Sequence, residues 1–182
     1  MRGRGVRIAA LGALVVVAVL VGFLVSRPTD EQAIQVDSPL LGTSAPHVTA
    51  STLGHTTVSL ASLRGRVVVL SFFASWCAAC ATEAPNLVTY AFHVHATHLP
   101  ATVLGVVYND GDAAVASFAQ HYGVTFPVLT DPQGELANDF AVASPPVTIV
   151  LDRRGRVAAV LQGPVTAHQL VAVTSHVLRT AA

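Results

Sequence analysis

The chain contains no lysine and few charged residues of any kind. Among its 182 residues are ten arginines and ten acidic residues, so only 11% are charged while 52% are hydrophobic; an ordinary soluble domain has roughly 25% charged residues. This composition excludes a disordered polyelectrolyte. The balanced charges provide no uniform positive field, so we expect no nucleic-acid partner. The length suits one compact domain with an appendage.

The charges that do occur are unevenly placed around a long hydrophobic run. Arg2, Arg4 and Arg7 precede the run and Arg27 follows it, which leaves six arginines and ten acidic residues from Pro28 onward. The run itself, Ile8 to Val25, has 18 apolar residues and would be about 27 Å long as a helix, just enough to cross a bilayer. The arginine bias predicts a cytoplasmic N-terminus and an extracytoplasmic remainder.

A cleaved secretory signal is the alternative interpretation of this run. Such a signal has a shorter apolar core and small residues in an A-x-A arrangement at the cleavage site, which Gly22 to Ser26 lacks. No cysteine lies nearby to accept a lipid. We therefore expect residues 1–26 to form an uncleaved single-pass anchor in the cell membrane, although either interpretation places the domain outside the cytoplasm.

The rest of the chain divides into a linker, residues 27–45, and a domain, residues 46–182. The linker is polar and contains prolines. Within the domain, apolar runs alternate between strand and helix patterns, which predicts an α/β fold with a mixed sheet. The predicted strands are Val48 to Ser51, Thr57 to Leu60, Arg66 to Phe73, Thr102 to Val107, Phe126 to Leu129, Val147 to Leu151 and Val157 to Leu161, and the predicted helices are Glu83 to His98, Ala113 to Tyr122, Gly134 to Phe140 and Thr166 to Leu178. We expect the first two strands to form a hairpin, and Asn109 to Asp112 to form a turn that caps the following helix.

The only two cysteines, Cys77 and Cys80, form a C-x-x-C motif between the most hydrophobic strand and a helix. The N-terminus of a helix carries partial positive charge, which favours ionisation of a nearby thiol, and the thiolate is the attacking species. We therefore expect Cys77 to be the nucleophile. Cys80, one turn later, would attack the resulting mixed disulfide and release the substrate.

Other interpretations of the cysteine pair are weaker. A structural disulfide gains little from closing so short a loop. A zinc site would need further ligands such as His93, His95 and His98, of which only the last two share a helix face, so we expect no metal. Two inert buried cysteines are uncommon at such a junction, and a binding module would not need a nucleophile paired with a resolving thiol.

Four segments together resemble a known family. They are Leu70 to Pro85 around the cysteines, Gly42 to Pro46, Val58 to Gly65 and Gly105 to Asp110, and in order and spacing they are similar to the membrane-tethered thioredoxin-like proteins of the TlpA/ResA/DsbE (CcmG) family. The resemblance extends from about Leu41 to the C-terminus. It implies a thioredoxin fold, in which helices flank a central mixed sheet, with an N-terminal β-hairpin extension and one N-terminal transmembrane helix. It also implies thiol-disulfide oxidoreductase activity without a cofactor.

The resemblance assigns roles to residues beyond the cysteines. Glu83 matches an acid that exchanges protons with the second cysteine, and partial burial would raise the pKa of its carboxyl. A first-turn glutamate that only complements the helix dipole is the alternative. Pro146 matches a proline with a cis peptide bond opposite the cysteines, and the resemblance places Trp76 and Pro145 with it in substrate binding.

The chain also departs from the family pattern at three positions. Ala79 stands where a proline commonly precedes the second cysteine, and Phe73 where a second tryptophan is usual. The residue before the cis-proline normally offers both backbone N–H and C=O to a substrate strand, but Pro145 has no N–H. We therefore expect substrates to be held there through the carbonyl alone.

Three functions remain open from the sequence. The first is reduction of disulfides in exported proteins, such as the C-x-x-C-H segment of apocytochrome c during cytochrome c maturation, with a membrane redox partner that resets the dithiol. The second is oxidation of secreted proteins by the same site, since sequence does not fix the redox potential. The third, a peroxiredoxin-like thiol peroxidase, is disfavoured because Leu70 and Ala74 replace the proline and threonine of the P-x-x-x-T-x-x-C pattern.

Overall fold

A computed structural model describes residues 34–180 of the chain. The predicted anchor, Ile8 to Val25, lies outside these residues. Among the described helices, none is both long enough and apolar enough to cross a membrane.

The core of the domain is a mixed six-stranded sheet in the order β1-β8-β7-β4-β5-β6. β4, β5 and β6 are parallel, whereas β7 runs antiparallel to β4 and β8 antiparallel to β7. All residues of β4 are buried, as expected for a central strand made only of apolar residues and one serine. The strands are β1 (Ile34–Gln35), β4 (Val67–Phe73), β5 (Ala101–Val107), β6 (Val128–Leu129), β7 (Val147–Leu151) and β8 (Val157–Gln162).

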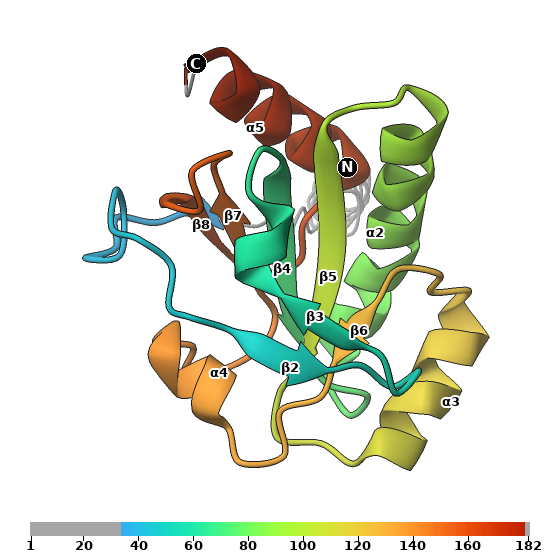
Figure 1. Ribbon diagram of the computed structural model, residues 1–182. Coiled ribbons are helices and arrows are strands. Elements are labelled where there is room, and N and C mark those ends of the chain that lie inside the picture. The colour runs from blue at the N-terminus through green and yellow to red at the C-terminus, as the bar shows by residue number, and fades with distance from the viewer. Residues whose placement is uncertain (1–33, 181–182) are drawn as a thin grey trace, which may run out of the picture. The chain divides into compact units, whose positions relative to one another are not determined.

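Alternate residues of β4 serve two separate hydrophobic layers. Val67 and Val69 pack with α2 (Ala78–Ala96) and α5 (Ala167–Thr180), which lie side by side along one face of the sheet (Figure 1). Phe73 extends this face toward α3 (Asp112–Tyr122). Val68, Leu70 and Phe72 face the other layer, which holds α4 (Glu135–Asp139) and the short helix η1 (Leu60–Leu63). This is the predicted α/β arrangement with a mixed sheet.

Two short strands between β1 and β4 form a separate sheet, which a bridge between Thr52 and Leu129 links to β6. β2 (Thr49–Ser51) and β3 (Thr57–Ser59) are antiparallel, with Ala50 opposite Val58. Through Ala50 and Val58 this small sheet packs on the layer that holds α4.

Residues 34–45 lie against the domain, although the sequence predicts a linker through residue 45. β1 pairs with β8 at the edge of the sheet. The N–H of Gly42 donates to the carbonyl of Val157, and the N–H of Ala45 to that of Gly155, both at 2.8 Å. β1 has only two residues and is held by backbone hydrogen bonds, so it shows no alternation of apolar and polar residues. The sequence pattern therefore does not reveal this strand.

The helix that follows the cysteines begins earlier than predicted. α2 starts at Ala78, not at Glu83, and Pro85 lies inside it. The reason is local capping, because the sulfur of Cys77 accepts a hydrogen bond from the N–H of Cys80. The predicted start of the last helix is confirmed: Thr166 and Gln169 exchange hydrogen bonds between side chain and backbone at its first turn.

Candidate active site

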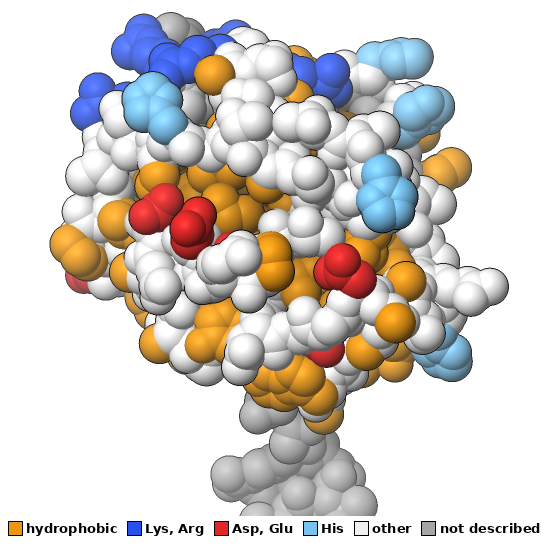
Figure 2. Space-filling view, turned by 60° about the horizontal axis from the view of Figure 1, so that its bottom comes forward, with side chains coloured by type: hydrophobic (Ala, Val, Ile, Leu, Met, Phe, Trp, Pro, Cys, Tyr) orange, Lys and Arg blue, Asp and Glu red, His pale blue; other side chains and the backbone are white. Residues whose placement is uncertain are grey.

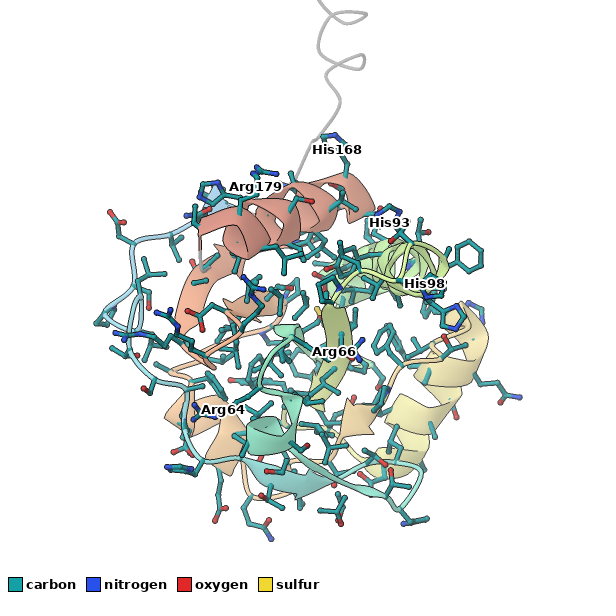
Figure 3. All side chains as sticks on the ribbon, turned by 45° about the horizontal axis from the view of Figure 1, so that its top comes forward. Arg64, Arg66, His93, His98, His168 and Arg179 are labelled. Carbon is teal, nitrogen blue, oxygen red and sulfur yellow. A yellow bond between two sulfur atoms is a disulfide. The ribbon has the colours of Figure 1, made fainter. Side chains whose placement is uncertain are left out.

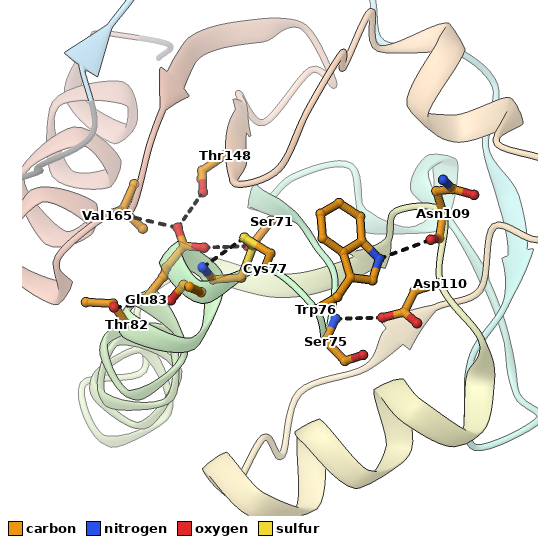
Figure 4. Close-up of a disulfide and its surroundings, with 12 residues drawn as sticks. Ser71, Ser75, Trp76, Cys77, Thr82, Glu83, Asn109, Asp110, Thr148 and Val165 are labelled. Carbon is orange, nitrogen blue, oxygen red and sulfur yellow. Dashed lines mark hydrogen bonds between the residues drawn. A yellow bond between two sulfur atoms is a disulfide. The ribbon is translucent and has the colours of Figure 1, made fainter.

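Cys77 and Cys80 form a disulfide at the junction between β4 and α2 (Figure 4). Their Cα atoms are 5.2 Å apart, and the N–H of Cys80 donates to the sulfur of Cys77 over 3.0 Å. The side chain of Cys77 is 8% exposed and that of Cys80 is 1% exposed. Cys77 therefore occupies the capping position at the positive end of α2 and is the more accessible sulfur.

The loop between β5 and α3 holds the outer side of this junction. Trp76, 59% exposed, donates from Nε1 to the carbonyl of Asn109 at 3.2 Å. The carboxylate of Asp110 accepts the N–H of Ser75 at 2.6 Å and that of Gly111 at 2.8 Å. These contacts fix the backbone just before Cys77.

The sequence pattern predicted a different role for Asp110. It placed the residue in a turn that caps α3, but the capping position belongs to Gly111, which makes no side-chain capping bond. Asp110 bonds instead to a residue 35 positions away. Its place directly after a buried strand, in the segment similar to the family pattern, was the one available signal.

Glu83 lies on the inner side of the junction, one turn after Cys80, and its side chain is fully buried. Its Oε1 accepts the backbone N–H of Val165 at 3.2 Å and the hydroxyl of Thr148 at 3.4 Å, while its Oε2 accepts the hydroxyl of Ser71 at 3.4 Å (Figure 4). Burial raises the pKa of this carboxyl from 4.5 to about 7, and the three hydrogen bonds only partly oppose the rise. The Glu83 carboxyl is therefore more deeply buried than the partial burial expected from the sequence.

Cys80 and Glu83 both line a small cavity of about 10 Å³. That volume is comparable to the space one water molecule needs. Apart from Cys80 and Glu83, its lining is apolar: Phe73, Ala84, Leu87, Phe118, Val124 and Phe126. The lining contains no cationic side chain, so Cys80 and Glu83 share a low-dielectric setting.

The peptide bond between Pro145 and Pro146 is cis, which confirms the prediction made for Pro146. The carbonyl of Pro146 accepts the N–H of Gly163 at 3.1 Å, and the hydroxyl of Tyr108 donates to the carbonyl of Ala143 at 2.6 Å, so the loop before β7 is held from two sides. β7 then passes beside β4, with Val147 opposite Phe72. Thr148 reaches Glu83 from this strand, which places the cis-proline segment next to the redox junction.

The surface near this end of the sheet is poor in positive charge. Figure 2 turns forward the side that carries α4, β2 and α3 in Figure 1, and hydrophobic side chains interspersed with a few acidic ones occupy its middle, while arginines gather at its upper rim.

The histidines considered as metal ligands lie far from the cysteines. His93 and His95 are in the last turn of α2, at the other end of the helix from Cys77, and Figure 3 places His93 and His98 at that end. Within residues 34–180, no three histidine, cysteine or acidic side chains are grouped so that they could hold a metal ion.

Comparison with known proteins gives consistent matches. The model of the AhpC/TSA family matches residues 41–160. The thiol-disulfide oxidoreductase ResA of Geobacillus thermodenitrificans is 29% identical over 140 residues, which are 76% of this chain and 75% of that protein. The DsbE homologue of Paracoccus denitrificans, a thiol:disulfide interchange protein, is 35% identical over 130 residues, 70% of this chain and 69% of that protein.

A solved structure matches the described fold. The crystal structure of a secreted thiol-disulfide isomerase from Corynebacterium glutamicum aligns with a TM-score of 0.68 at 26% identity, over 84% of this chain and 95% of that one. The fold is therefore thioredoxin-like, with the C-x-x-C pair at the start of a helix.

Proposed function

Because the chain belongs to the AhpC/TSA family and is a thiol-disulfide oxidoreductase of the ResA and DsbE type, we propose that it reduces disulfides in exported proteins. The substrate class we infer is a disulfide within an extended segment, with the C-x-x-C-H segment of apocytochrome c as the main candidate. The run from Ile8 to Val25 would anchor the chain in the cell membrane with the domain outside.

The reaction is a two-electron exchange between dithiols and disulfides. In the reduced enzyme, the Cys77 thiolate attacks a substrate sulfur, forms a mixed disulfide and releases the other substrate sulfur as a thiolate. Cys80 then loses its proton to Glu83, and its thiolate attacks the Cys77 sulfur. The Cys77–Cys80 disulfide forms, the bond to the substrate breaks, and the substrate leaves as a dithiol. A membrane redox partner would return two electrons to the enzyme.

The observation that carries this proposal is the buried carboxyl beside Cys80. A fully buried Glu83 disfavours a second negative charge at Cys80, whereas the helix N-terminus and the Cys80 N–H favour a thiolate at Cys77. A dithiol with one destabilised thiolate gives up its electrons more readily than one whose reduced form is stabilised. The buried Glu83 therefore supports reduction over oxidation, whereas the stabilised Cys77 thiolate acts in the opposite direction.

We infer that Trp76 and the cis-proline segment, Pro145 and Pro146, bind the substrate. The exposed indole of Trp76 offers an apolar surface next to Cys77. Pro145 provides a carbonyl but no N–H, so a bound segment can donate to it but not accept from it. We infer that substrates are held mainly by the mixed disulfide and by apolar contact.

The decisive experiment is the equilibrium redox potential of the Cys77–Cys80 pair in glutathione buffers, combined with turnover of a peptide that carries an oxidised C-x-x-C-H segment. We expect a strongly reducing potential and reduction of the peptide. Cys77→Ser, which cannot form the Cys77–Cys80 disulfide, should not reduce the peptide. A potential near that of oxidising folding enzymes would assign the site to disulfide formation. Peroxide consumption faster than peptide reduction would assign the site to peroxidase chemistry. We do not expect this result, because Leu70 and Ala74 replace the proline and threonine of the peroxidase pattern.

A further inference from the structure

We propose that Ser71 is a positioning residue of the resolving step. Its hydroxyl accepts a hydrogen bond from the proton that Glu83 carries on Oε2, while Oε1 stays bound to the backbone of Val165 and to Thr148. This inference rests on the proposed function, since it concerns the proton that Cys80 gives up.

The two carboxyl oxygens of Glu83 have different partners. Oε1 receives two donors, the Val165 N–H at 3.2 Å and the Thr148 hydroxyl at 3.4 Å. Oε2 receives one, the Ser71 hydroxyl at 3.4 Å. A backbone N–H can donate but never accept, so a proton on Oε1 could bond only to Thr148 and would leave the Val165 N–H with the acid hydroxyl oxygen, a weaker acceptor than a carbonyl oxygen. The proton therefore belongs on Oε2.

A serine hydroxyl can serve both charge states of its neighbour. It donates to the ionised carboxylate, and after rotation about its Cβ–Oγ bond it accepts from the protonated carboxyl. Ser71 is itself fully buried in β4, so no water competes for this bond. A fixed donor or a cation at the same place would stabilise only the carboxylate and oppose proton uptake.

No other titratable group among the described residues competes for the proton. The elements that contact Glu83 or share its cavity contribute Ser71 from β4, Thr148 from β7 and the Val165 backbone from the loop before α5, together with Cys80 and apolar side chains. Among these, Cys80 alone can exchange a proton with Glu83.

The proton balance of the step follows from this arrangement. The Cys80 thiol transfers its proton to Oε2, and the Ser71 hydroxyl turns to accept a hydrogen bond from the resulting acid O–H. The thiolate then attacks the Cys77 sulfur, the Cys77–Cys80 bond forms, and the bond between Cys77 and the substrate breaks. The proton later returns through the cavity to the departing substrate thiolate or to solvent.

The test compares Ser71→Ala with Thr148→Val in the full-length protein, by difference infrared spectroscopy of the carboxylic acid carbonyl band. At about pH 6, Glu83 is largely protonated while ordinary carboxyls are ionised, and the band is assigned by its loss in Glu83→Gln. We expect Ser71→Ala to move the band to higher frequency, because the acid O–H loses its acceptor. Thr148→Val should raise the frequency further than Ser71→Ala does, because it removes a donor to the carbonyl oxygen Oε1. Ser71→Thr, which retains the hydroxyl, should keep the wild-type band.

A second measurement uses the pH dependence of resolution, followed as decay of a preformed Cys77 mixed disulfide. Thr148→Val removes a donor that mainly serves the carboxylate, so it should raise the midpoint by about one pH unit. Ser71→Ala removes a partner of both charge states and should move the midpoint much less. An unchanged infrared band in Ser71→Ala, or equal midpoint shifts in both variants, would refute the inference and make Ser71 a simple donor.

Failure of the proposed function has a different signature. If Glu83→Gln resolves the mixed disulfide at the wild-type rate, Glu83 is not the proton acceptor. The infrared comparison would still report where the proton resides on that carboxyl.

Discussion

Replacing Glu83 with glutamine should make the oxidised protein more stable at alkaline pH and nearly abolish the pH dependence that this carboxyl imposes. In the wild type, the folded state binds the Glu83 proton more tightly than the unfolded state, because burial raises the pKa of the carboxyl from 4.5 to about 7. Stability therefore falls as the pH rises from 4.5, and the loss is complete above about pH 7.

The size of the effect follows from the same two values. A difference between 4.5 and about 7 corresponds to roughly 3 kcal/mol between the protonated and ionised forms. Glutamine keeps the hydrogen bonds, since its Oε1 can accept from Val165 and Thr148 while its Nε2 donates to Ser71. The variant should therefore exceed the wild type by up to about 3 kcal/mol at pH 8 and match it near pH 4.5.

Urea unfolding of the full chain in detergent, with its disulfide intact, measures this difference. The chain has a single tryptophan, Trp76, next to the disulfide, so its fluorescence reports the transition. Curves should be recorded at several pH values between 4.5 and 8 for both proteins. If the free energy of unfolding depends on pH in the same way in both proteins, burial does not raise the pKa of Glu83. The reasoning from the environment of this carboxyl would then be wrong.

Three further predictions concern the thiols, the packing behind them and the N-terminus. In the reduced protein, iodoacetamide should label Cys77 well before Cys80, and Cys80→Ala should accumulate mixed disulfides through Cys77; faster labelling of Cys80 would reverse the roles. Gly105→Ala should lower the free energy of unfolding by about 1–3 kcal/mol, because the new Cβ would lie 2.8 Å from the Phe73 side chain. The control is Gly54→Ala, whose new Cβ meets only ordinary van der Waals contacts and should have little effect on the melting temperature. Mass analysis of the membrane-bound protein should find an N-terminus at Met1 or the next residue, and a soluble form that begins beyond residue 25 would identify a cleaved signal.

Local patterns were sufficient to predict most of the fold. The hydrophobic periods predicted the order of strands and helices, and β7 was placed at Val147–Leu151 as the structure has it. The two cysteines were recognised at a strand-to-helix junction because both the motif and the junction lie within a few neighbouring residues. These features depend on contacts between near neighbours in the chain, which a sequence displays directly.

The environment that gives the site its chemistry came only from the tertiary structure. The groups around Glu83 lie 12, 65 and 82 residues away, and Asp110 bonds to a backbone N–H 35 residues away. Nothing in the local pattern of Ser71, Thr148 or Val165 distinguishes them from other strand and loop residues. The sequence by itself therefore determined the C-x-x-C pair, its place at a strand-to-helix junction and the glutamate three residues later. Sheet pairing decided how deeply that carboxyl is buried and which groups bond to each of its oxygens, because burial and hydrogen-bond partners are properties of segments brought together by folding.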